Sequence, residues 1–388
     1  MTLAAPAAIR AAFGTVSRPL PAADLSQTIS FARLALIVGL VFLHYESFPN
    51  SSVSPFRGFD PDHHQVATFL NSFVLFFFFS VVPLLSIVSG WLFFSFASAP
   101  QDAVRQALVH RIRRRFQSLY LPLLFWNALF LGAMAALYRF APDHPLLAQL
   151  NIDFRSAAAA DYLNAIFGAT GHPIAFQFWF VRDLFLSILI SPAIWLVLRT
   201  APFLGAATLG LAWITGHDLW IFFRTDVLFF FFLGGLIRVR GWPLTVSWRT
   251  TVAFLAVYLL LVALRTAAPV VVDGHMPLLA AATRGMRLFG VVACWGLFQR
   301  LAGTGSGRVM ARYGGLAFFL HAAHFPLLAE VKILLWPLLP AETDGWMLAH
   351  YAASVLITIG LGVAAGILLA RLFPRAFAFL NGGRAALG

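Results

Sequence analysis

The amino-acid sequence predicts an all-α protein that crosses a membrane about ten times and keeps both termini in the cytoplasm. Three observations support this prediction: the composition, the repeated long apolar runs and the placement of the positive charges. Of the 388 residues, 60% are hydrophobic and only 11% are charged, with 41 Phe and 11 Trp. A soluble domain of this length does not need so much apolar surface, so the composition indicates a multi-pass membrane protein.

Ten apolar segments have about the length that a bilayer crossing requires, which is roughly 20 residues. The fifth and the eighth are short. Together they form a membrane domain over 28–375, between tails at 1–27 and 376–388. The predicted spans are 28–45, 69–96, 118–138, 178–198, 201–216, 219–237, 250–268, 285–300, 313–336 and 346–371.

The basic residues set the predicted orientation. With both termini inside, the tails, the loops and the adjoining span ends on that side hold 17 Arg residues, whereas the opposite loops and span ends hold six. This imbalance agrees with the positive-inside rule. The formal charge of +12 is therefore mainly a signal of topology, and nucleic-acid binding is not expected.

The first predicted span contains Arg33 and His44, eleven residues apart. At about 100° and 1.5 Å per residue, His44 lies within roughly 20° of Arg33 on the helix and about 16 Å further along it. An arginine reaching the headgroups and a histidine at the interface would be one interpretation. Two ionisable groups on one helical face instead favour a protein-lined cavity with a function.

A basic run precedes the third span and contains Arg111, Arg113, Arg114 and Arg115. One interpretation is an anchor that lies on anionic lipid. The other is a cytoplasmic phosphate site, because the arginine fork suits bidentate phosphate contacts. The composition leaves both open.

The fourth span opens with Trp179, Arg182 and Asp183. Neighbouring residues point about 100° apart on a helix, so Arg182 and Asp183 are not expected to satisfy only each other. They either form a polar contact between helices or line the same cavity as His44.

The ninth span contains His321 and His324, which share a helical face. No acidic or cysteine ligands are arranged around them, so a metal site is not expected. Pro326 should kink this span and free a backbone carbonyl. Two intramembrane carboxylates, Glu330 and Asp226, are candidates for pairing with a cation or orienting an imidazole.

Taken in order, these motifs resemble the acyltransferase-3 family of bacterial integral-membrane O-acyltransferases. The resemblance covers about 30–375, and its most specific element is the Arg-x10-His pattern of the first span. Trp91 is a mild departure, since relatives often have Phe there, and the family does not require a histidine at 321. The motifs are Arg33-x10-His44, Ser89-Gly90-Trp91-Leu92, Arg113-x-Arg115, Trp179-Phe180-x-Arg182-Asp183 with Ser191-Pro192, and His324-x-Pro326.

This resemblance implies an enzyme of the bacterial inner membrane that takes an acyl group, expected to be acetyl, from cytoplasmic acyl-coenzyme A. The acceptor would be a hydroxyl of a cell-surface or exported carbohydrate. Arg33 and His44 would be essential. Relatives often end in a fused esterase-like domain, which is not expected here. The acceptor and the oligomeric state stay open.

The expected mechanism gives each candidate residue a role. Phosphates of acetyl-coenzyme A would bind the basic run, chiefly Arg113 and Arg115, and the pantetheine arm would pass Arg33. His44 would act as general base, with an acyl-histidine as the alternative route. Arg182 or a helix amide would stabilise the oxyanion. Either Glu330 or Asp226 would orient His44. The expected catalytic residues are His44, Arg33, Arg182, Asp183 and Glu330. The donor would bind Arg111, Arg113, Arg114 and Arg115, and the acceptor would bind His321, His324, Trp179 and Asp226.

Two other functions compete with this interpretation. A transporter or flippase of lipid-linked sugars would share the buried charges, and a structural subunit of a polysaccharide export assembly would share the topology. Ten spans without an internal repeat, together with the arginine run, favour the enzyme.

Overall fold

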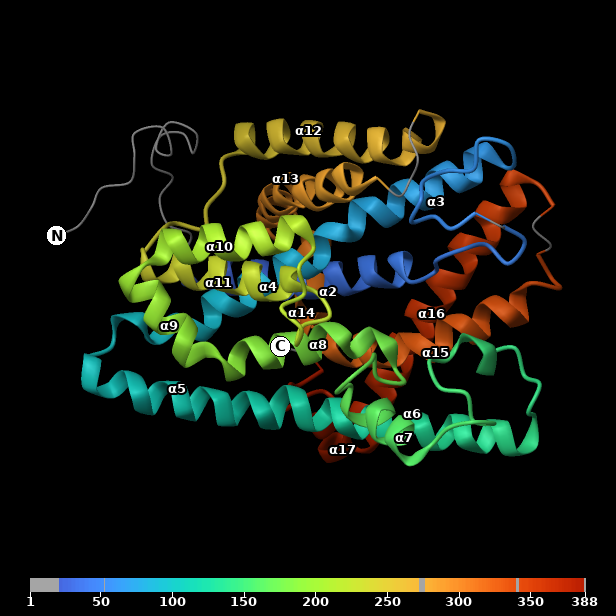
Figure 1. Ribbon diagram of the computed structural model, residues 1–388, viewed down its shortest axis with the longest axis horizontal. Coiled ribbons are helices and arrows are strands. Elements are labelled where there is room, and N and C mark those ends of the chain that lie inside the picture. Colours follow the sequence, from blue (N-terminus) through green and yellow to red (C-terminus); the bar gives the residue numbers. More distant parts are fainter. Residues whose placement is uncertain (1–20, 52, 272–275, 340–341, 387–388) are drawn as a thin grey trace.

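The computed structural model describes residues 21–386 apart from 52, 272–275 and 340–341 (Figure 1). The first 20 residues of the predicted N-terminal tail, with Arg10 and Arg18, lie outside the described residues. The described part is all-α. Its helices are α2 (Ala22–Leu43), α3 (Gln65–Phe77), α4 (Val81–Phe93), α5 (Gln101–Arg115), α6 (Leu121–Phe140), α7 (Ala159–Phe167), α8 (Trp179–Leu189), α9 (Ser191–Thr200), α10 (Pro202–Thr215), α11 (Thr225–Val239), α12 (Trp248–Ala267), α13 (Pro277–Ala302), α14 (Gly305–Arg312), α15 (Ala317–Leu335), α16 (Asp344–Leu372) and α17 (Pro374–Leu380).

Shorter helical turns join several of these helices into longer runs. Six are 3-10 turns and η3 is a π-helical turn. They are η1 (Phe78–Ser80), η2 (Phe94–Ser98), η3 (Phe116–Tyr120), η4 (Leu147–Gln149), η5 (Phe176–Phe178), η6 (Ala268–Val270) and η7 (Tyr313–Leu316).

Within the described residues, seven helical runs are long and apolar enough to cross a membrane. The run Phe176–Leu189 and its neighbour α9 meet at a bend of 61°, and they add an eighth if they count as one span. The predicted fifth and sixth spans form α10 and α11, of 14 and 15 residues. At about 1.5 Å per residue these helices are shorter than the roughly 30 Å hydrocarbon core. These two short helices account for the difference between the ten predicted spans and the eight that the structure supports when the bent pair counts as one span.

Helix α2 runs through the middle of the bundle, where α4, α13, α14 and α15 pack around it (Figure 1). Buried residues lie on every face of α2, from Thr28 to Val41, so other helices rather than lipid surround it. Arg33 within α2, and His44 directly after its last residue, therefore lie at internal positions of the bundle.

Helices α4 and α11 approach so closely that their backbones touch. A Cβ atom on Gly90 would collide with the carbonyl oxygen of Phe231, and one on Gly234 with the carbonyl oxygen of Ile87. Small residues are what allow membrane helices to pack at this distance. The Gly90 and Gly234 positions thus draw α4 and α11 together.

We expect Gly90→Ala to lower the free energy of unfolding by about 1–3 kcal/mol, because a backbone carbonyl cannot rotate away as a side chain can. Gly360→Ala in α16 is the matched control, since a Cβ there meets nothing within 4 Å. The control should be neutral or stabilising by up to about 1 kcal/mol, through helix propensity alone. Thermal unfolding of both variants in the same detergent compares them, and equal melting temperatures would contradict the close approach.

The predicted kink in the ninth span is confirmed in α15. Phe325 has non-helical angles, φ −115° and ψ 128°, directly before Pro326. Proline has no N–H for the carbonyl four residues earlier, which belongs to Ala322. The side chain of Gln177 supplies the missing donor: its Nε2 donates to the carbonyls of Ala322 (3.0 Å) and Phe325 (3.1 Å).

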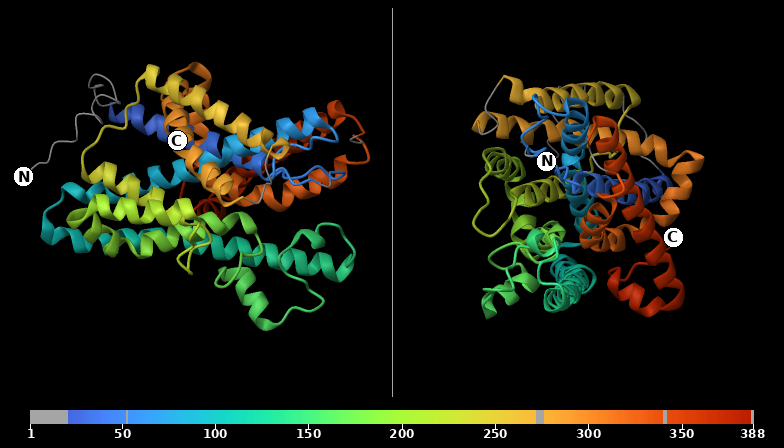
Figure 2. Two further views of the ribbon diagram at one scale, coloured as in Figure 1. Left: turned by 45° about the horizontal axis from the view of Figure 1, so that its top comes forward. Right: turned by 90° about the vertical axis from the view of Figure 1, so that its right-hand side faces the viewer.

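The segment between α6 and α8, which contains η4 and α7, projects as a green lobe at one end of the bundle (Figure 2). Asn127 of α6 attaches it, donating from Nδ2 to the carbonyl of Ile166 (2.9 Å). This lobe brings polar side chains to the end of α2 where His44 lies.

Candidate active site

Two separate cavities follow one another along α2. The first, the large cavity, has a volume of about 670 Å³ and is lined by His44 and the residues after it. The second, the arginine cavity, has a volume of about 100 Å³ and is lined by Arg33 and Ile37. The two ionisable groups of the first span therefore face different cavities.

His44 forms a hydrogen bond with His324, with 2.8 Å between Nδ1 of His44 and Nε2 of His324. The two ring planes differ by only 4°. On its other side, Nδ1 of His324 lies 3.3 Å from the carbonyl oxygen of Leu320. A carbonyl can only accept, so the proton of His324 belongs on Nδ1, and its Nε2 accepts from the Nδ1–H of His44. This order of bonds leaves Nε2 of His44 as the nitrogen with a free lone pair.

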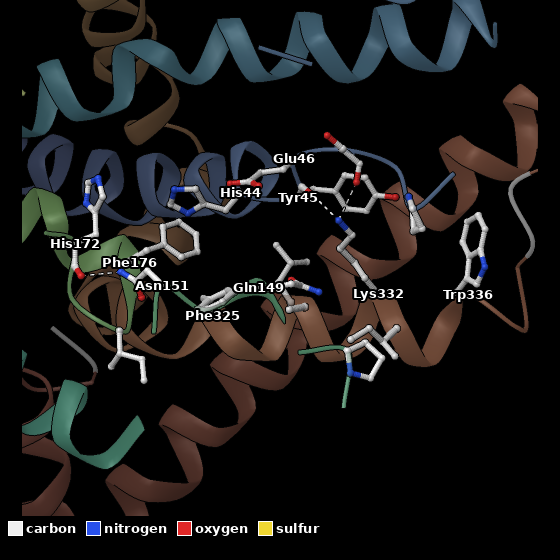
Figure 3. Close-up of a pocket in the computed structure, with 17 residues that line it drawn as sticks. His44, Tyr45, Glu46, Gln149, Asn151, His172, Phe176, Phe325, Lys332 and Trp336 are labelled. Atoms are coloured by element: carbon white, nitrogen blue, oxygen red, sulfur yellow. Dashed lines mark hydrogen bonds between the residues drawn. The ribbon is translucent and has the colours of Figure 1, made fainter. Parts of the chain in front are cut away.

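The large cavity has the mixed lining of a small-molecule site (Figure 3). Lys332 shapes one wall, because its Nζ donates to the carbonyls of Tyr45 (2.6 Å) and Ser47 (3.0 Å). Asn151 of the projecting lobe donates to the carbonyl of His172 (2.7 Å) and so holds the opposite wall. The polar and aromatic residues that line it are His44, Tyr45, Glu46, Ser47, Gln149, Asn151, His172, Phe176, Phe325, Lys332 and Trp336.

Two titratable groups in loops of this wall are perturbed. Removal from water raises the pKa of Glu46, and the nearby charge of Lys332 partly offsets that effect. Burial lowers the pKa of His172, and the positive charges of Arg224 and Arg182 lower it further. The wall of the cavity thus favours a protonated carboxyl and a neutral imidazole compared with the same groups in water.

A side cavity of about 210 Å³ also reaches His44 and Glu46. It contains the predicted residues Trp179 and Asp226. Asp226 accepts a hydrogen bond from Arg287 (2.8 Å), and the guanidinium of Arg224 lies 4.9 Å from the ring centroid of Trp179. The structure therefore brings both predicted residues to the neighbourhood of His44, each with an arginine.

The arginine cavity gathers residues from distant parts of the chain. Arg33 comes from α2, Arg115 from the end of α5 and Arg384 from the segment after α17. Ser89 and His321 also line it. His321 is 2% exposed, and neither of its ring nitrogens has a hydrogen-bond partner among the described residues.

Arg182 and Asp183 line none of these three cavities. Arg182 donates to Asp183 (2.7 Å), to the carbonyl of Gly168 (3.1 Å) and to the carbonyl of Ile221. Asp183 also accepts from the backbone N–H of Arg224 (2.9 Å). The pair thus joins two loops to the start of α8, a structural arrangement rather than the expected position beside His44.

The predicted donor set is divided. Arg115 reaches the arginine cavity, whereas Arg113 and Arg114 are exposed and line no described cavity. Arg111 donates to the carbonyls of Leu92 (3.0 Å) and Phe93 (2.9 Å), at the C-terminal end of α4. The expectation that Arg113 and Arg115 act together does not fit this placement, because they leave α5 in different directions.

Glu330 does not orient His44. It lies 3.7 Å from Nδ1 of His144 in the projecting lobe, beyond the Pro326 kink. The partner of His44 is His324, which was expected to bind the acceptor.

Among the described residues, no group of three or more His, Cys, Asp or Glu side chains is arranged to hold a metal ion.

Sequence reasoning missed Lys332, Gln177 and Arg384. Lys332 is the one lysine of the chain, and it stands in an apolar span, which is a usable signal. Gln177 and Arg384 carry no comparable signal, because their roles depend on contacts with residues more than 50 positions away.

Comparison with known proteins places the chain in a family. The acyltransferase domain that defines the acyltransferase 3 family matches residues 27–380. The chain belongs to the acyltransferase 3 family. This family member is 27% identical over 364 residues to the succinoglycan biosynthesis protein ExoH of Rhizobium meliloti (strain 1021), covering 93% of each chain. No solved structure matches it significantly.

Proposed function

We propose that the chain is a membrane O-acyltransferase that moves an acyl group, expected to be acetyl, from acyl-coenzyme A to a hydroxyl of a cell-surface or exported carbohydrate. The observation that supports this most is the bond between His44 and His324 at the wall of the large cavity, with the arginine cavity further along the same helix. A base and a cationic site stand on one helix, about 16 Å apart along its axis.

His44 is the proposed general base. Its Nδ1–H is engaged by His324, so its Nε2 can take a proton from a hydroxyl in the large cavity. When Nε2 gains that proton, the hydrogen bond to His324 keeps the ring in place. A positioned imidazole of this kind contributes about 10²- to 10⁴-fold to the rate.

The donor and the acceptor enter from opposite ends of α2 in this proposal. The cationic side chains of the arginine cavity suit the phosphates of coenzyme A, and this end would face the cytoplasm. The large cavity, with Gln149, Asn151 and Trp336 in its wall, suits a sugar. A relative named for succinoglycan biosynthesis supports a carbohydrate acceptor.

The transfer is a single displacement at the thioester. His44 removes the hydroxyl proton as the acceptor oxygen bonds to the carbonyl carbon. The bond from that carbon to sulfur then breaks, and the departing sulfur takes the proton from His44. An ester and free coenzyme A result, and His44 returns to its starting state.

The test is the release of coenzyme A by the purified protein in nanodiscs, from acetyl-coenzyme A and from longer acyl donors. We expect release that depends on an added cell-envelope glycan extract. If a folded protein releases nothing from any donor with glycan present, the proposal is wrong, and a flippase of lipid-linked sugars becomes the better interpretation.

A further inference from the structure

The C-terminal segment after α17 turns back into the bundle instead of leaving it. Gly382 and Gly383 have φ of +66° and +77°, which permits the turn. Asn381 holds it in place: its Oδ1 accepts from the N–H of Phe319 (3.0 Å), and its Nδ2 donates to the carbonyl of Gly315 (2.8 Å). These bonds place Arg384 in the wall of the arginine cavity.

The arginine cavity has no counter-charge of its own. Arg33, Arg115 and Arg384 line it, and no Asp or Glu does so among the described residues. Burial lowers the pKa of Arg384 to about 9, and the positive charges of Arg33 and Arg115 contribute to this shift. Charges removed from water are normally paired, so three partly buried arginines around one cavity without a carboxylate indicate a site for an anionic ligand.

His321 is a second and independent sign of a ligand. It is buried beside the arginines, and both of its ring nitrogens lack partners among the described residues. A buried polar group without a hydrogen bond is costly, and a bound anion would supply the acceptor for an imidazole N–H. The cavity volume of about 100 Å³ exceeds several-fold the space that one water molecule needs.

We propose that the C-terminal segment contributes Arg384 as a further binding residue of the donor site, where it holds the diphosphate of the acyl donor together with Arg33 and Arg115. The identity of the donor rests on the proposed function. The axial separation of about 16 Å between Arg33 and His44 is comparable to the length of an extended phosphopantetheine arm. A diphosphate held by these arginines therefore leaves the thioester within reach of His44.

The test measures binding of coenzyme A and of inorganic pyrophosphate in phosphatidylcholine nanodiscs, which contain no anionic lipid. We expect Arg384→Gln to weaken both by about ten- to hundred-fold, the loss of one or two charge-assisted hydrogen bonds. Arg375→Gln is the matched control, because Arg375 is an exposed arginine of the neighbouring α17; it should bind like the wild type. If Arg384→Gln and the wild type bind pyrophosphate equally well, Arg384 does not belong to a phosphate-binding site and the inference is wrong.

Ser89→Asp tests the site without disturbing the C-terminal segment. A carboxylate at this position would pair with the arginines, so we expect loss of pyrophosphate binding with no decrease in melting temperature. Ser89→Asn has nearly the same size without the charge, so it should lose less binding than Ser89→Asp. If Ser89→Asp binds pyrophosphate as the wild type does, the site is wrong.

The two ligands separate this inference from the proposed function. Pyrophosphate binding that requires Arg384, without any binding of coenzyme A, would support the phosphate site and overturn the proposed donor. If added phosphatidylglycerol displaces pyrophosphate but coenzyme A does not, the site holds a lipid headgroup, which overturns its assignment to the donor.

Discussion

His44→Gln is expected to lower the rate of acyl transfer by about 10²- to 10⁴-fold while coenzyme A binding stays unchanged. Glutamine retains a similar size and a hydrogen bond to His324, but it cannot take up a proton at neutral pH. Donor binding should persist because His44 does not line the arginine cavity. Coenzyme A release and coenzyme A binding, measured on the same nanodisc preparation, check both parts.

Two variants of His324 test how His44 is oriented. His324→Gln keeps an oxygen that can accept from Nδ1–H of His44, so it should retain more activity than His324→Leu, which cannot. His144→Gln serves as the control, because this histidine lies in the projecting lobe and lines none of the three cavities. Full activity of His44→Gln would remove the general base from the mechanism, and equal activity of the two His324 variants would remove the orienting bond.

Asp183→Ala is expected to lower the free energy of unfolding by about 3–5 kcal/mol. The side chain of Asp183 is 0% exposed, and Arg182 beside it is 11% exposed. Removing the carboxylate leaves a buried guanidinium without its counter-charge, and the backbone N–H of Arg224 loses its acceptor. Thermal or denaturant unfolding in detergent measures the loss.

Asp143→Ala is the matched control for this prediction. Asp143 pairs with Arg155 at 3.1 Å, but the two side chains are 90% and 65% exposed, so its loss should cost no more than about 1 kcal/mol. A folded Asp183→Ala protein with wild-type stability and no transfer would contradict the structural role and return the Arg182–Asp183 pair to the reaction.

The sequence predicted the local features of this protein well. Arg33 and His44 mark the central helix because a charge in an apolar span needs a protein environment. Pro326 predicted the kink of α15, since proline cannot continue the hydrogen-bond ladder. Each of these features depends on one segment and its neighbours in the chain.

The number of spans was harder to predict. Helices α10 and α11 have the composition of membrane spans but only 14 and 15 residues. An apolar composition is expected both of a helix that faces lipid and of a helix that is buried among other helices, so composition alone does not distinguish them. Eleven of the residues of α11 are buried in the bundle, so its hydrophobicity reflects packing as much as lipid contact.

By itself, the sequence determined an all-α membrane protein with an arginine and a histidine along one central segment, because composition and helical period are properties of single segments. Only the tertiary structure decided which groups meet: His324 rather than Glu330 pairs with His44, and Arg384 rather than Arg113 joins Arg115. Contacts between residues hundreds of positions apart depend on how whole helices pack. That packing is set by the sum of many apolar contacts, which no short motif encodes.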